Sequence, residues 1–522
     1  MIIVEEKARD GNVILKLIKN GKEYYLSSKY YPLEESKKIA KNLNFKNEII
    51  LIIGIGNPYL IEEIKEIHPE KKIIILEPLE EVVEKLKEIN LLPKCEIKII
   101  KEENELKEFL SSLSYFDYYI HPQYKNLIED IKSWEDVIKS TIHTLAINKN
   151  TLIKFGRVWA KNFILSIEKS TSSKGVNLIF RKFQNSNAIV IGAGPSLDEH
   201  IKTIKELYNE CVIISSDTSF PYLVRNNLIP DFVITVDPQL KNFIYLLQNK
   251  NYENTIFIAD TLYIPLIYDF IPRENIFLFD SPFKVWQRII EKTAPKGEIM
   301  VGGSVICSAI DLSNKIGASN IILAGNDLSY PKRKIYSKQN FYEINFFLDS
   351  SIFSPYDQWK ILSKYPLIKK SDKESNTLLT DPRMIIFKEW IEKYIKTNNI
   401  NLINLSTSGL VIEGAKSLEN YIPSKLNRDE INKIKKELIN LPLNKPYKLT
   451  ELKEKIISLQ RNLILGKVGK TIETIEEDKM LKELLELSLQ KTLLKEYTED
   501  EFIKALEEEV KYLGKILKIV IK

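Results

Sequence analysis

The sequence has little cysteine and little histidine. Its three cysteines, Cys95, Cys211 and Cys307, lie far apart among 522 residues, and an odd number cannot all pair within one chain. No CxxC pair is present, so we expect reduced core cysteines rather than a disulfide framework or a metal site. The chain also lacks an HExxH pattern, a Walker A lysine and a GxSxG sequence. Metalloprotease, P-loop ATPase and α/β-hydrolase functions therefore have no support in the sequence.

An excess of charge of one sign and a long apolar run are missing as well. The chain has 76 Lys and Arg against 71 Asp and Glu, a net charge of +5, which gives no electrostatic basis for binding nucleic acid. No apolar segment reaches the roughly 20 residues that span a membrane. The first residues lack the basic and apolar blocks of a secretory signal. We expect a cytoplasmic protein with no membrane span and no nucleic-acid partner.

What is present is enough apolar sequence for several cores. Hydrophobic residues make up 44% of the chain, and at roughly 150 residues a domain the length predicts about three domains. We expect an α/β protein with a β-hairpin and Rossmann-like domain over 1–150, a central mostly parallel-sheet domain over 151–424, and a helical domain over 425–522. The last domain is rich in Lys, Glu, Leu and Ile at helical spacing, with no glycine between Gly414 and Gly466.

The N-terminal domain begins with alternating apolar and polar residues around "DGN" and "NGK", which predict hairpin turns. "EIILIIGIGNPYLIEEIKEIHPEKKIIILEP" then predicts a strand, a glycine loop, a helix and a second strand that ends in Glu77. The loop, Gly54-x-Gly56-Asn57, lacks the third glycine of a dinucleotide-binding fingerprint. Glu77 is placed to bind a ribose hydroxyl, but we favour a degenerate Rossmann unit with a structural role over a cofactor site.

Six short apolar runs dominate the central domain. They are "AIVIGAG", "CVIISSD", "FVITVDP", "TIFIAD", "NIFLFD" and "NIILAGND". Unbroken runs suit parallel strands that are covered on both faces, and ligands bind at the carboxyl ends of such strands. Asp217 and Asp237 lie at two of these ends. They would bind a sugar hydroxyl, a ribose or Mg²⁺, or act as a general base; the alternative is that they only cap the following loops.

The stretch "IVIGAGPSLDEHI" ends a strand with Gly192, Gly194, Pro195 and Ser196. The two glycines would leave the backbone open to a ligand, the proline suits a helix entry, and the serine can cap the helix. Unpaired N–H groups at such a helix start favour phosphate. The alternative is a tight connecting turn with a capping serine.

A second turn of the same kind, Gly302-Gly303-Ser304, comes before another helical stretch and a strand that ends in Gly325-Asn326-Asp327. Close helix packing is the alternative reason for these glycines. Residues 333–382 are polar, aromatic and irregular, and we expect them to form an insertion or a lid over this edge of the sheet.

Together these motifs resemble the motility accessory factor family of flagellin glycosyltransferases, which shares its central domain with an archaeal pterin diphosphokinase. The matching stretches are "IVIGAGPSLDEHI", "IISSDTSFPYLVRNNLIPDFVITVDPQ", "GGSVICSAIDLSNKIGASNIILAGNDLSYP" and "LINLSTSGLVIEG". The resemblance implies a central domain similar to bacterial sialyltransferases. It also implies transfer of a nonulosonic acid, a sialic-acid-like sugar such as pseudaminic or legionaminic acid, from its CMP-activated form to a Ser or Thr of flagellin.

The resemblance further implies where the donor binds. The residues carried over are Gly192, Gly194, Pro195, Ser196, Asp217, Thr218, Gly302, Gly303, Ser304, Asn326, Tyr330, Ser406 and Gly409. For the base that takes the proton of the acceptor hydroxyl we choose Asp327 first and Asp237 second. The related sialyltransferases use a histidine from a lid segment, whereas this chain has no histidine after His200, so either the base is another group or the acceptor oxygen is activated differently.

Two other functions stay open at this point. A pyrophosphokinase would move diphosphate from ATP to a hydroxymethylpterin and would hold Mg²⁺, the one cofactor that we consider, with clustered aspartates. The archaeal relatives tend to have Asp-Leu-Asp at this strand end, whereas "TVDPQ" offers a single aspartate. A non-catalytic flagellin-binding factor would use the helical tail as a chaperone surface.

Overall fold

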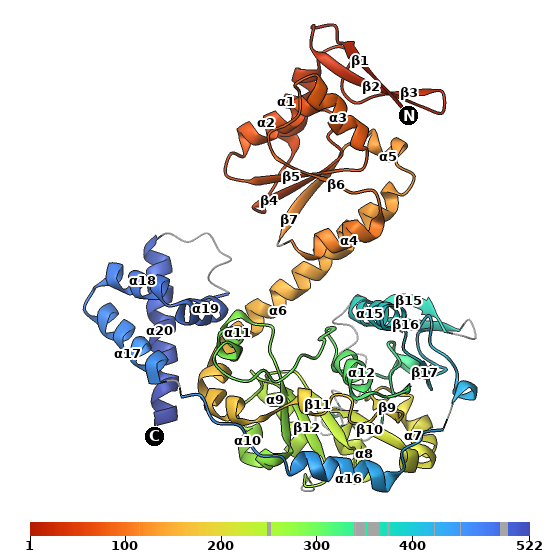
Figure 1. Cartoon of the computed structure of the whole chain (residues 1–522), viewed down its shortest axis with the longest axis vertical. Helices are drawn as coiled ribbons and strands as arrows, with labels where there is room; N and C mark the ends of the chain where they lie inside the picture. Colours follow the sequence, from red (N-terminus) through yellow and green to blue (C-terminus); the bar gives the residue numbers. More distant parts are fainter. Residues whose placement is uncertain are drawn as a thin grey trace. The chain divides into compact units, whose positions relative to one another are not determined.

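The computed structural model describes residues 1–113, 115–247, 252–338, 340, 350–352, 366–372, 376–421, 423–448, 450–490 and 499–521. The chain divides into two compact units, Met1–Ile153 and Lys154–Lys522, and the long helix α6 (Ile131–Ser172) passes from the first into the second (Figure 1). Across the described ranges, no helix is both long and apolar enough to cross a membrane.

The first unit combines an antiparallel and a parallel sheet. The predicted hairpins form β1 (Ile2–Lys7), β2 (Val13–Lys19) and β3 (Lys22–Tyr25). The parallel sheet has the order β6-β5-β4-β7, which is the order of half a Rossmann sheet. Its elements are β4 (Ile49–Ile53), α2 (Pro58–Ile67), β5 (Lys72–Glu77), α3 (Glu80–Glu88), β6 (Glu96–Ile99), α4 (Glu103–Ser111), β7 (Phe116–Ile120) and α5 (Tyr124–Leu127), and α1 (Pro32–Asn42) precedes them.

The second unit is built on an eight-stranded sheet in which every neighbouring pair runs parallel. The order is β17-β14-β9-β10-β11-β12-β13-β8. The strands are β8 (Lys174–Gly175), β9 (Asn187–Ile191), β10 (Cys211–Ser216), β11 (Phe232–Thr235), β12 (Ile256–Asp260), β13 (Ile276–Phe279), β14 (Asn320–Ala324) and β17 (Leu402–Asn404). Six of them, β9 to β14, are the six apolar runs, so the α/β class and the parallel central sheet are confirmed.

Helices cover both faces of this sheet, which is why its strands are apolar throughout. Ala188 and Val190 of β9 pack into one core, while Ile189 and Ile191 pack into another on the opposite face. The first face carries α12 (Val305–Ile316), α15 (Pro382–Asn398) and α16 (Arg428–Ile439). The second face carries α7 (Leu197–Leu207), α8 (Phe220–Arg225), α9 (Leu240–Leu247) and α10 (Ile267–Phe270).

The strand order changes direction beside β9. Strands β10 to β13 are added on one side of β9, whereas β14 lies on its other side. The loops that follow β9 and β14 therefore start next to each other at the carboxyl edge of the sheet. Such a switch point is where open parallel sheets bind their ligands.

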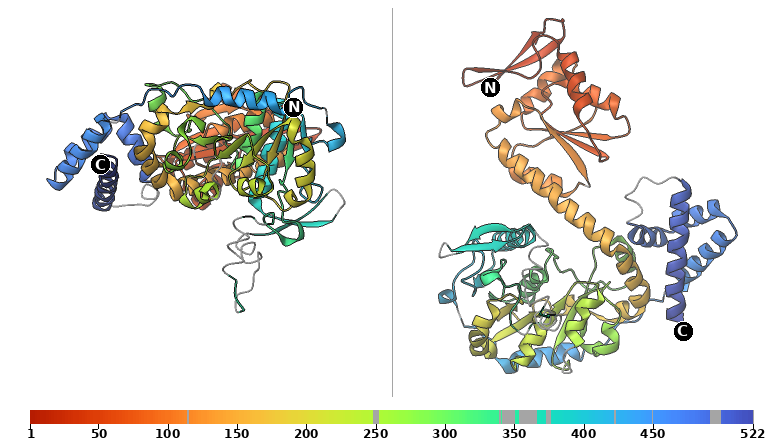
Figure 2. Two further views of the ribbon diagram at one scale, coloured as in Figure 1. Left: turned by 90° about the horizontal axis from the view of Figure 1, so that it is seen from below. Right: turned by 180° about the vertical axis from the view of Figure 1, so that it is seen from behind.

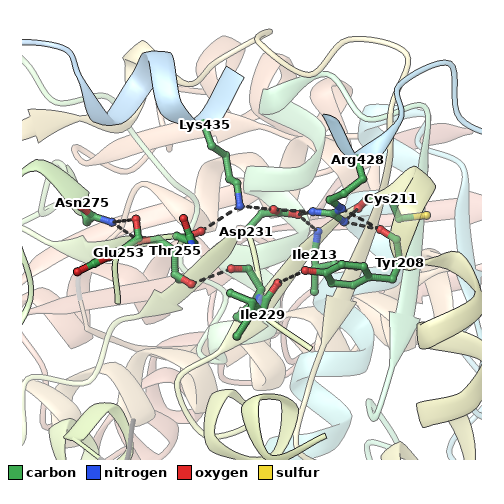
Figure 3. A network of polar contacts seen from close by, with 12 residues as sticks. Tyr208, Cys211, Ile213, Ile229, Asp231, Glu253, Thr255, Asn275, Arg428 and Lys435 are labelled. Atoms are coloured by element: carbon green, nitrogen blue, oxygen red, sulfur yellow. Dashed lines mark hydrogen bonds and ion pairs between the residues drawn. The ribbon is translucent and has the colours of Figure 1, made fainter. Parts of the chain in front are cut away.

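At the opposite edge a buried ionic network holds α16 on the sheet (Figure 3). Asp231 comes just before β11, is fully buried, and pairs with Arg428 at 2.8 Å and Lys435 at 2.7 Å. The expected boundary after residue 424 places α16 in a separate helical domain, but the structure packs it on the central sheet. Its Ile431 and Leu438 belong to the sheet core, which the local sequence pattern does not reveal.

The remaining tail is helical, as expected. It comprises α17 (Thr450–Ile464), α18 (Val468–Glu477), α19 (Lys479–Ser488) and α20 (Glu499–Ile521), which pack on one another (Figures 1 and 2). Arg288 of α11 (Lys284–Ile290) pairs with Glu483 of α19 at 3.0 Å. The structure groups all residues from Lys154 onward into one compact unit. The division into three domains at 150 and 424 stays a prediction.

Candidate functional site

The loop after β9 packs directly on the loop after β14. The Gly192 N–H donates to the Ala324 carbonyl at 2.9 Å, and the Gly194 N–H donates to the Gly325 carbonyl at 2.8 Å. A Cβ at Gly192 would lie 2.5 Å from Asn326 Oδ1 and 2.6 Å from the Gly325 carbonyl oxygen. These glycines therefore let two loops of the chain approach each other, and the expectation that they keep the backbone open to a ligand stays a prediction.

Asp327, in the loop after β14, makes hydrogen bonds to the start of α7 and to the segment after β17. Its Oδ2 accepts the Ser196 backbone N–H at 3.0 Å, and its Oδ1 accepts the Ser406 hydroxyl at 2.7 Å. Its carbonyl oxygen accepts the Leu410 N–H at 2.9 Å. A Cβ at Gly409 would lie 2.5 Å from that carbonyl oxygen. Ser406 and Gly409 thus position Asp327 and do not line the cavity described below.

The predicted cap by Ser196 is wrong. Ser196 has helical backbone angles (φ −67°, ψ −14°), and its side chain makes no capping hydrogen bond. A side-chain cap requires extended backbone at this position, and the Asp198 and Glu199 N–H groups instead donate to the carbonyls of Pro195 and Ser196. The Ser196 hydroxyl oxygen is buried and has no hydrogen-bond partner within the described residues.

The second glycine–serine turn has a side-chain cap, which we expected at Ser196 only. Ser304 is extended, and its hydroxyl accepts the Ile306 N–H at 3.4 Å at the start of α12. A Cβ at Gly302 would lie 2.7 Å from the Trp390 ring, and one at Gly303 would lie 3.1 Å from Phe387. Close packing against α15 is therefore the reason for Gly302, which is the alternative that the sequence left open, whereas Gly303 also has a φ of +81°, which favours glycine.

The two turns enclose a cavity of about 460 Å³ at the switch point. Seven of the residues expected at the site line it: Gly192, Gly194, Thr218, Ser304, Asn326, Asp327 and Tyr330. The first turn of α12 supplies Ser304 to Cys307, so backbone N–H groups of a helix start border the cavity. The glycine loop after β9 and the turn before α12 thus lie beside the same cavity. No local sequence pattern predicts that they meet.

The two aspartates at the ends of β10 and β11 do not line this cavity. Asp217 is buried and accepts hydrogen bonds from the Thr218 N–H at 2.7 Å and the Thr235 hydroxyl at 2.7 Å. Burial raises the pKa of Asp217 to about 6. Asp237 accepts the Gln239 N–H at 3.0 Å. Both carboxylates cap the loops that follow their strands, and Pro195, Ser196, Gly302 and Gly303 also lie outside the cavity lining.

The sequence reasoning missed one wall of the cavity. Arg383, Met384, Phe387 and Ile391 of α15 line it, together with Tyr336. The hairpin β15 (Ile368–Ser371) and β16 (Thr377–Thr380) leads into this helix. The signal was "TDPR", an aspartate and a proline at a helix start followed by a basic residue, but the surrounding segment reads as an irregular insertion.

Part of the expected lid is described. After η4 (Pro331–Arg333), the Ser337 N–H donates to the Ala193 carbonyl at 2.9 Å. The Asn340 amide donates to the Thr218 carbonyl at 3.1 Å. Ile335 and Tyr336 line the cavity, so this part of the segment covers the loop after β9. Residues 339, 341–349, 353–365 and 373–375 of the expected lid lie outside the described residues.

Neither a histidine nor an acidic cluster marks a metal centre here. His200 is on α7, and burial lowers its pKa; it does not line the cavity. Within the described ranges, no group of three or more His, Cys, Asp or Glu side chains is arranged to hold a metal ion. The Mg²⁺ considered above stays a prediction.

The glycine loop of the first unit is filled by the chain itself. A Cβ at Gly54 would lie 2.6 Å from the Tyr124 ring, and one at Gly56 would lie 2.5 Å from His121. Glu77 accepts the Ile55 N–H and the Tyr124 hydroxyl, each at 2.7 Å. Burial raises the pKa of Glu77 to about 7. The loop and its acid thus serve packing, in line with the degenerate Rossmann unit that we favoured.

Comparison with known proteins agrees with this architecture. Residues 161–333 match the family described as 6-hydroxymethylpterin diphosphokinase MptE-like. The 6-hydroxymethyl-7,8-dihydropterin pyrophosphokinase of Methanothermobacter thermautotrophicus is 28% identical over 148 residues, 27% of this chain and 58% of that protein. An uncharacterized protein of Treponema pallidum is 26% identical over 130 residues, 24% of this chain and 59% of that protein. The chain thus spans a little under three fifths of the length of these curated relatives.

A solved structure extends the likeness over the whole chain. The MAf glycosyltransferase from Magnetospirillum magneticum AMB-1 matches with a TM-score of 0.60 at 13% identity, covering 99% of this chain and 92% of that chain. The chain therefore has the fold of that glycosyltransferase, and its central segment carries the pterin diphosphokinase-like sequence pattern. Both parts of the resemblance stated from the sequence are confirmed.

Proposed function

We propose that the protein is a glycosyltransferase that moves a nonulosonic acid from its CMP-activated form to Ser or Thr hydroxyls of flagellin in the cytoplasm. The observation that carries the proposal is the 460 Å³ cavity at the switch point, bordered by the loop after β9, the first turn of α12 and Asp327. The whole-chain likeness to the MAf glycosyltransferase supports a transferase rather than a binding factor. The sugar and the acceptor follow from the family resemblance.

The chemistry of such a donor suits the cavity wall. Departure of CMP places negative charge on a phosphate, which needs stabilisation more than it needs a proton. The N–H groups at the start of α12 point toward such a charge with the positive end of the helix dipole. One well-placed donor of this kind is worth about 3 kcal/mol in an oxyanion site. Ser304 adds a hydroxyl donor in the same lining, whereas the Thr218 hydroxyl already donates to Asp217 at 2.9 Å.

Of the two carboxylates chosen for the base, Asp327 fits the site and Asp237 does not. Asp327 lines the cavity, whereas Asp237 is outside its lining. Both Asp327 oxygens already accept a hydrogen bond, but an ionised carboxylate has about four lone-pair positions, so about two remain, and the acceptor hydroxyl needs one. A positioned base contributes about 10²- to 10⁴-fold to such a proton transfer.

The test is mass spectrometry of flagellin co-expressed with this protein and a CMP-nonulosonate pathway. A sugar-sized mass increase on flagellin that depends on Asp327 supports the proposal. Flagellin that binds the protein but gains no mass supports a non-catalytic binding factor and overturns it. Release of CMP from the donor gives the same answer in a purified system.

A second candidate is a pterin pyrophosphokinase, which the match over residues 161–333 and the Methanothermobacter relative favour. It requires a bound divalent cation, and the described residues offer no acidic cluster of three or more for one. Conversion of ATP to AMP in the presence of a hydroxymethylpterin is the result expected from this activity alone.

A further inference from the structure

Arg383 is held at the wall of the cavity by Asp381, two residues before it, and by Tyr330, which is distant in the sequence. Its Nη2 donates to Asp381 Oδ2 at 2.6 Å and its Nε to Asp381 Oδ1 at 3.2 Å, so the carboxylate binds one edge of the guanidinium. The Tyr330 hydroxyl, 51 residues earlier, donates to the same Oδ2 at 2.5 Å and accepts from Arg383 Nη2 at 3.4 Å. Tyr330 and Arg383 both line the cavity.

The burial of this group of three is uneven. The Asp381 side chain is fully buried, whereas 42% of the Arg383 side chain remains exposed. Asp381 also caps α15, because its carboxylate accepts the Arg383 N–H at 2.8 Å. Burial alone would raise the pKa of Asp381, but the hydrogen bonds from Arg383 and Tyr330 outweigh it and hold that pKa below its usual value. The buried Asp381 carboxylate therefore fixes the position of Arg383, and Arg383 lines the cavity.

Arg383 lies close to the start of α12. Phe387 follows Arg383 by four residues on α15, and residues at this spacing share one face of a helix. A Cβ at Gly303, just before α12, would lie 3.1 Å from the Phe387 ring. Arg383 and Phe387 are about one helical turn apart, roughly 6 Å along α15, and the guanidinium and the N–H groups of the α12 start border the same cavity.

We propose that Arg383 binds the phosphate of the nucleotide in this cavity and that Asp381 and Tyr330 position it for that contact. An arginine presents paired N–H donors in a planar fork that matches two phosphate oxygens. Its pairing with Asp381 fixes the guanidinium before the ligand arrives, which lowers the entropic cost of binding. In the proposed function the N–H groups at the α12 start bind the same phosphate, so Arg383 and the helix start would share its oxygens.

This inference deepens the proposed function and rests on it for the identity of the nucleotide. The experiment is calorimetric titration of the full-length protein with CMP, with cytidine, which lacks the phosphate, and with ATP. Arg383→Gln is expected to weaken CMP binding by roughly tenfold to a hundredfold, the range for a hydrogen bond to a charged group. Cytidine affinity is expected to stay within about twofold, because cytidine has no phosphate for Arg383 to bind.

Three further variants separate positioning from general damage. Arg383→Lys keeps the charge and loses the fork, so its CMP affinity should fall between those of the wild type and Arg383→Gln. Tyr330→Phe removes the hydroxyl that binds Asp381 and should lower CMP affinity by less than Arg383→Gln, with cytidine again unaffected. Lys393→Gln removes an exposed cation from the same helix and should leave both ligands unaffected.

The outcomes distinguish the two proposals. Equal CMP affinity in the wild type and Arg383→Gln, or an equal loss for CMP and cytidine, overturns the role of Arg383. If the wild type binds ATP but not CMP, the nonulosonate donor is wrong, and the role of Arg383 is then decided by whether Arg383→Gln weakens ATP binding. A wild type that binds neither nucleotide overturns both.

Discussion

The carboxylate of Asp327 accepts the backbone N–H of Ser196 at 3.0 Å, joining residues 131 positions apart at the switch point of the central sheet. Ser196 itself makes no side-chain cap on α7. The Asp327 carboxylate therefore contacts the start of α7, and the same residue lines the cavity. Structural and chemical roles of Asp327 therefore have to be separated by experiment.

Asp327→Asn should make this separation. The amide oxygen can accept the Ser196 N–H, and the amide nitrogen can donate to the Ser406 hydroxyl, so both contacts survive with the polarity of one reversed. The variant loses the negative charge that takes the acceptor proton, and we expect turnover to fall about 10²- to 10⁴-fold. Sugar transfer to flagellin and CMP affinity are the measurements, with CMP affinity unchanged. Unchanged turnover would remove Asp327 from the mechanism.

Gly409→Ala tests the support behind Asp327. The new methyl carbon would meet the Asp327 carbonyl oxygen at 2.5 Å, so that backbone must move. Overpacking of this kind typically costs 1–3 kcal/mol of unfolding free energy, and a displaced Asp327 should lose activity as well. Chemical denaturation and transfer assays measure the two effects.

The matched control is Gly469→Ala in α18, where the added methyl meets nothing within 4 Å. Alanine is the better helix former by about 0.5–1 kcal/mol, so this variant should be as stable as the wild type or more so. Equal stability of the Gly409 and Gly469 variants contradicts the close packing at Gly409.

Asp231→Ala should destabilise the second unit strongly. Asp231 is the buried partner of both Arg428 and Lys435, whose side chains are 14% and 7% exposed (Figure 3). Removal of one member of a buried ion pair leaves uncompensated charge and typically costs 3–5 kcal/mol. Asp269→Ala breaks an exposed pair with Lys169 and should cost about 1 kcal/mol or less. If the denaturation midpoints of the two variants coincide, the ionic network around Asp231 does not stabilise the second unit as proposed.

The raised pKa of Glu77 predicts that the stability of the first unit depends on pH. Burial raises the pKa of Glu77 from 4.5 to about 7, so between these values the folded state binds more protons than the unfolded state. The contribution of Glu77 to stability is therefore complete below about pH 4.5 and is lost as the pH rises through 7. Amide hydrogen exchange of the segment from Gly54 to Glu77 should speed up over this range more in the wild type than in Glu77→Gln. Identical pH profiles in both proteins would contradict the prediction.

Local sequence patterns were sufficient to predict the strands of the central sheet. Unbroken apolar runs are buried on both faces wherever they form strands, so β9 to β14 could be read directly from the sequence. Asp and Gly at the ends of these runs marked the edge at which the cavity lies. The capping serine at Ser304 was also local, since a cap depends on only three consecutive residues.

The site itself depended on contacts that no local pattern contains. The glycines at 192, 194, 302 and 303 look like ligand-binding glycines, and their packing partners Asn326, Trp390 and Phe387 are more than 80 residues away. Tyr330, Asp381 and Arg383 meet only because β16 and α15 pack beside the cavity.

The sequence by itself determined the α/β class, the order of the strands along the chain and the carboxyl edge as the place for function, because short-range burial patterns specify them. Only the tertiary structure decided which carboxylate lines the cavity, which ones cap loops, and that an arginine from α15 completes the wall. The physical reason is that a parallel sheet places strands from distant parts of the sequence side by side. The chemistry at its edge is set by that adjacency rather than by neighbours along the chain.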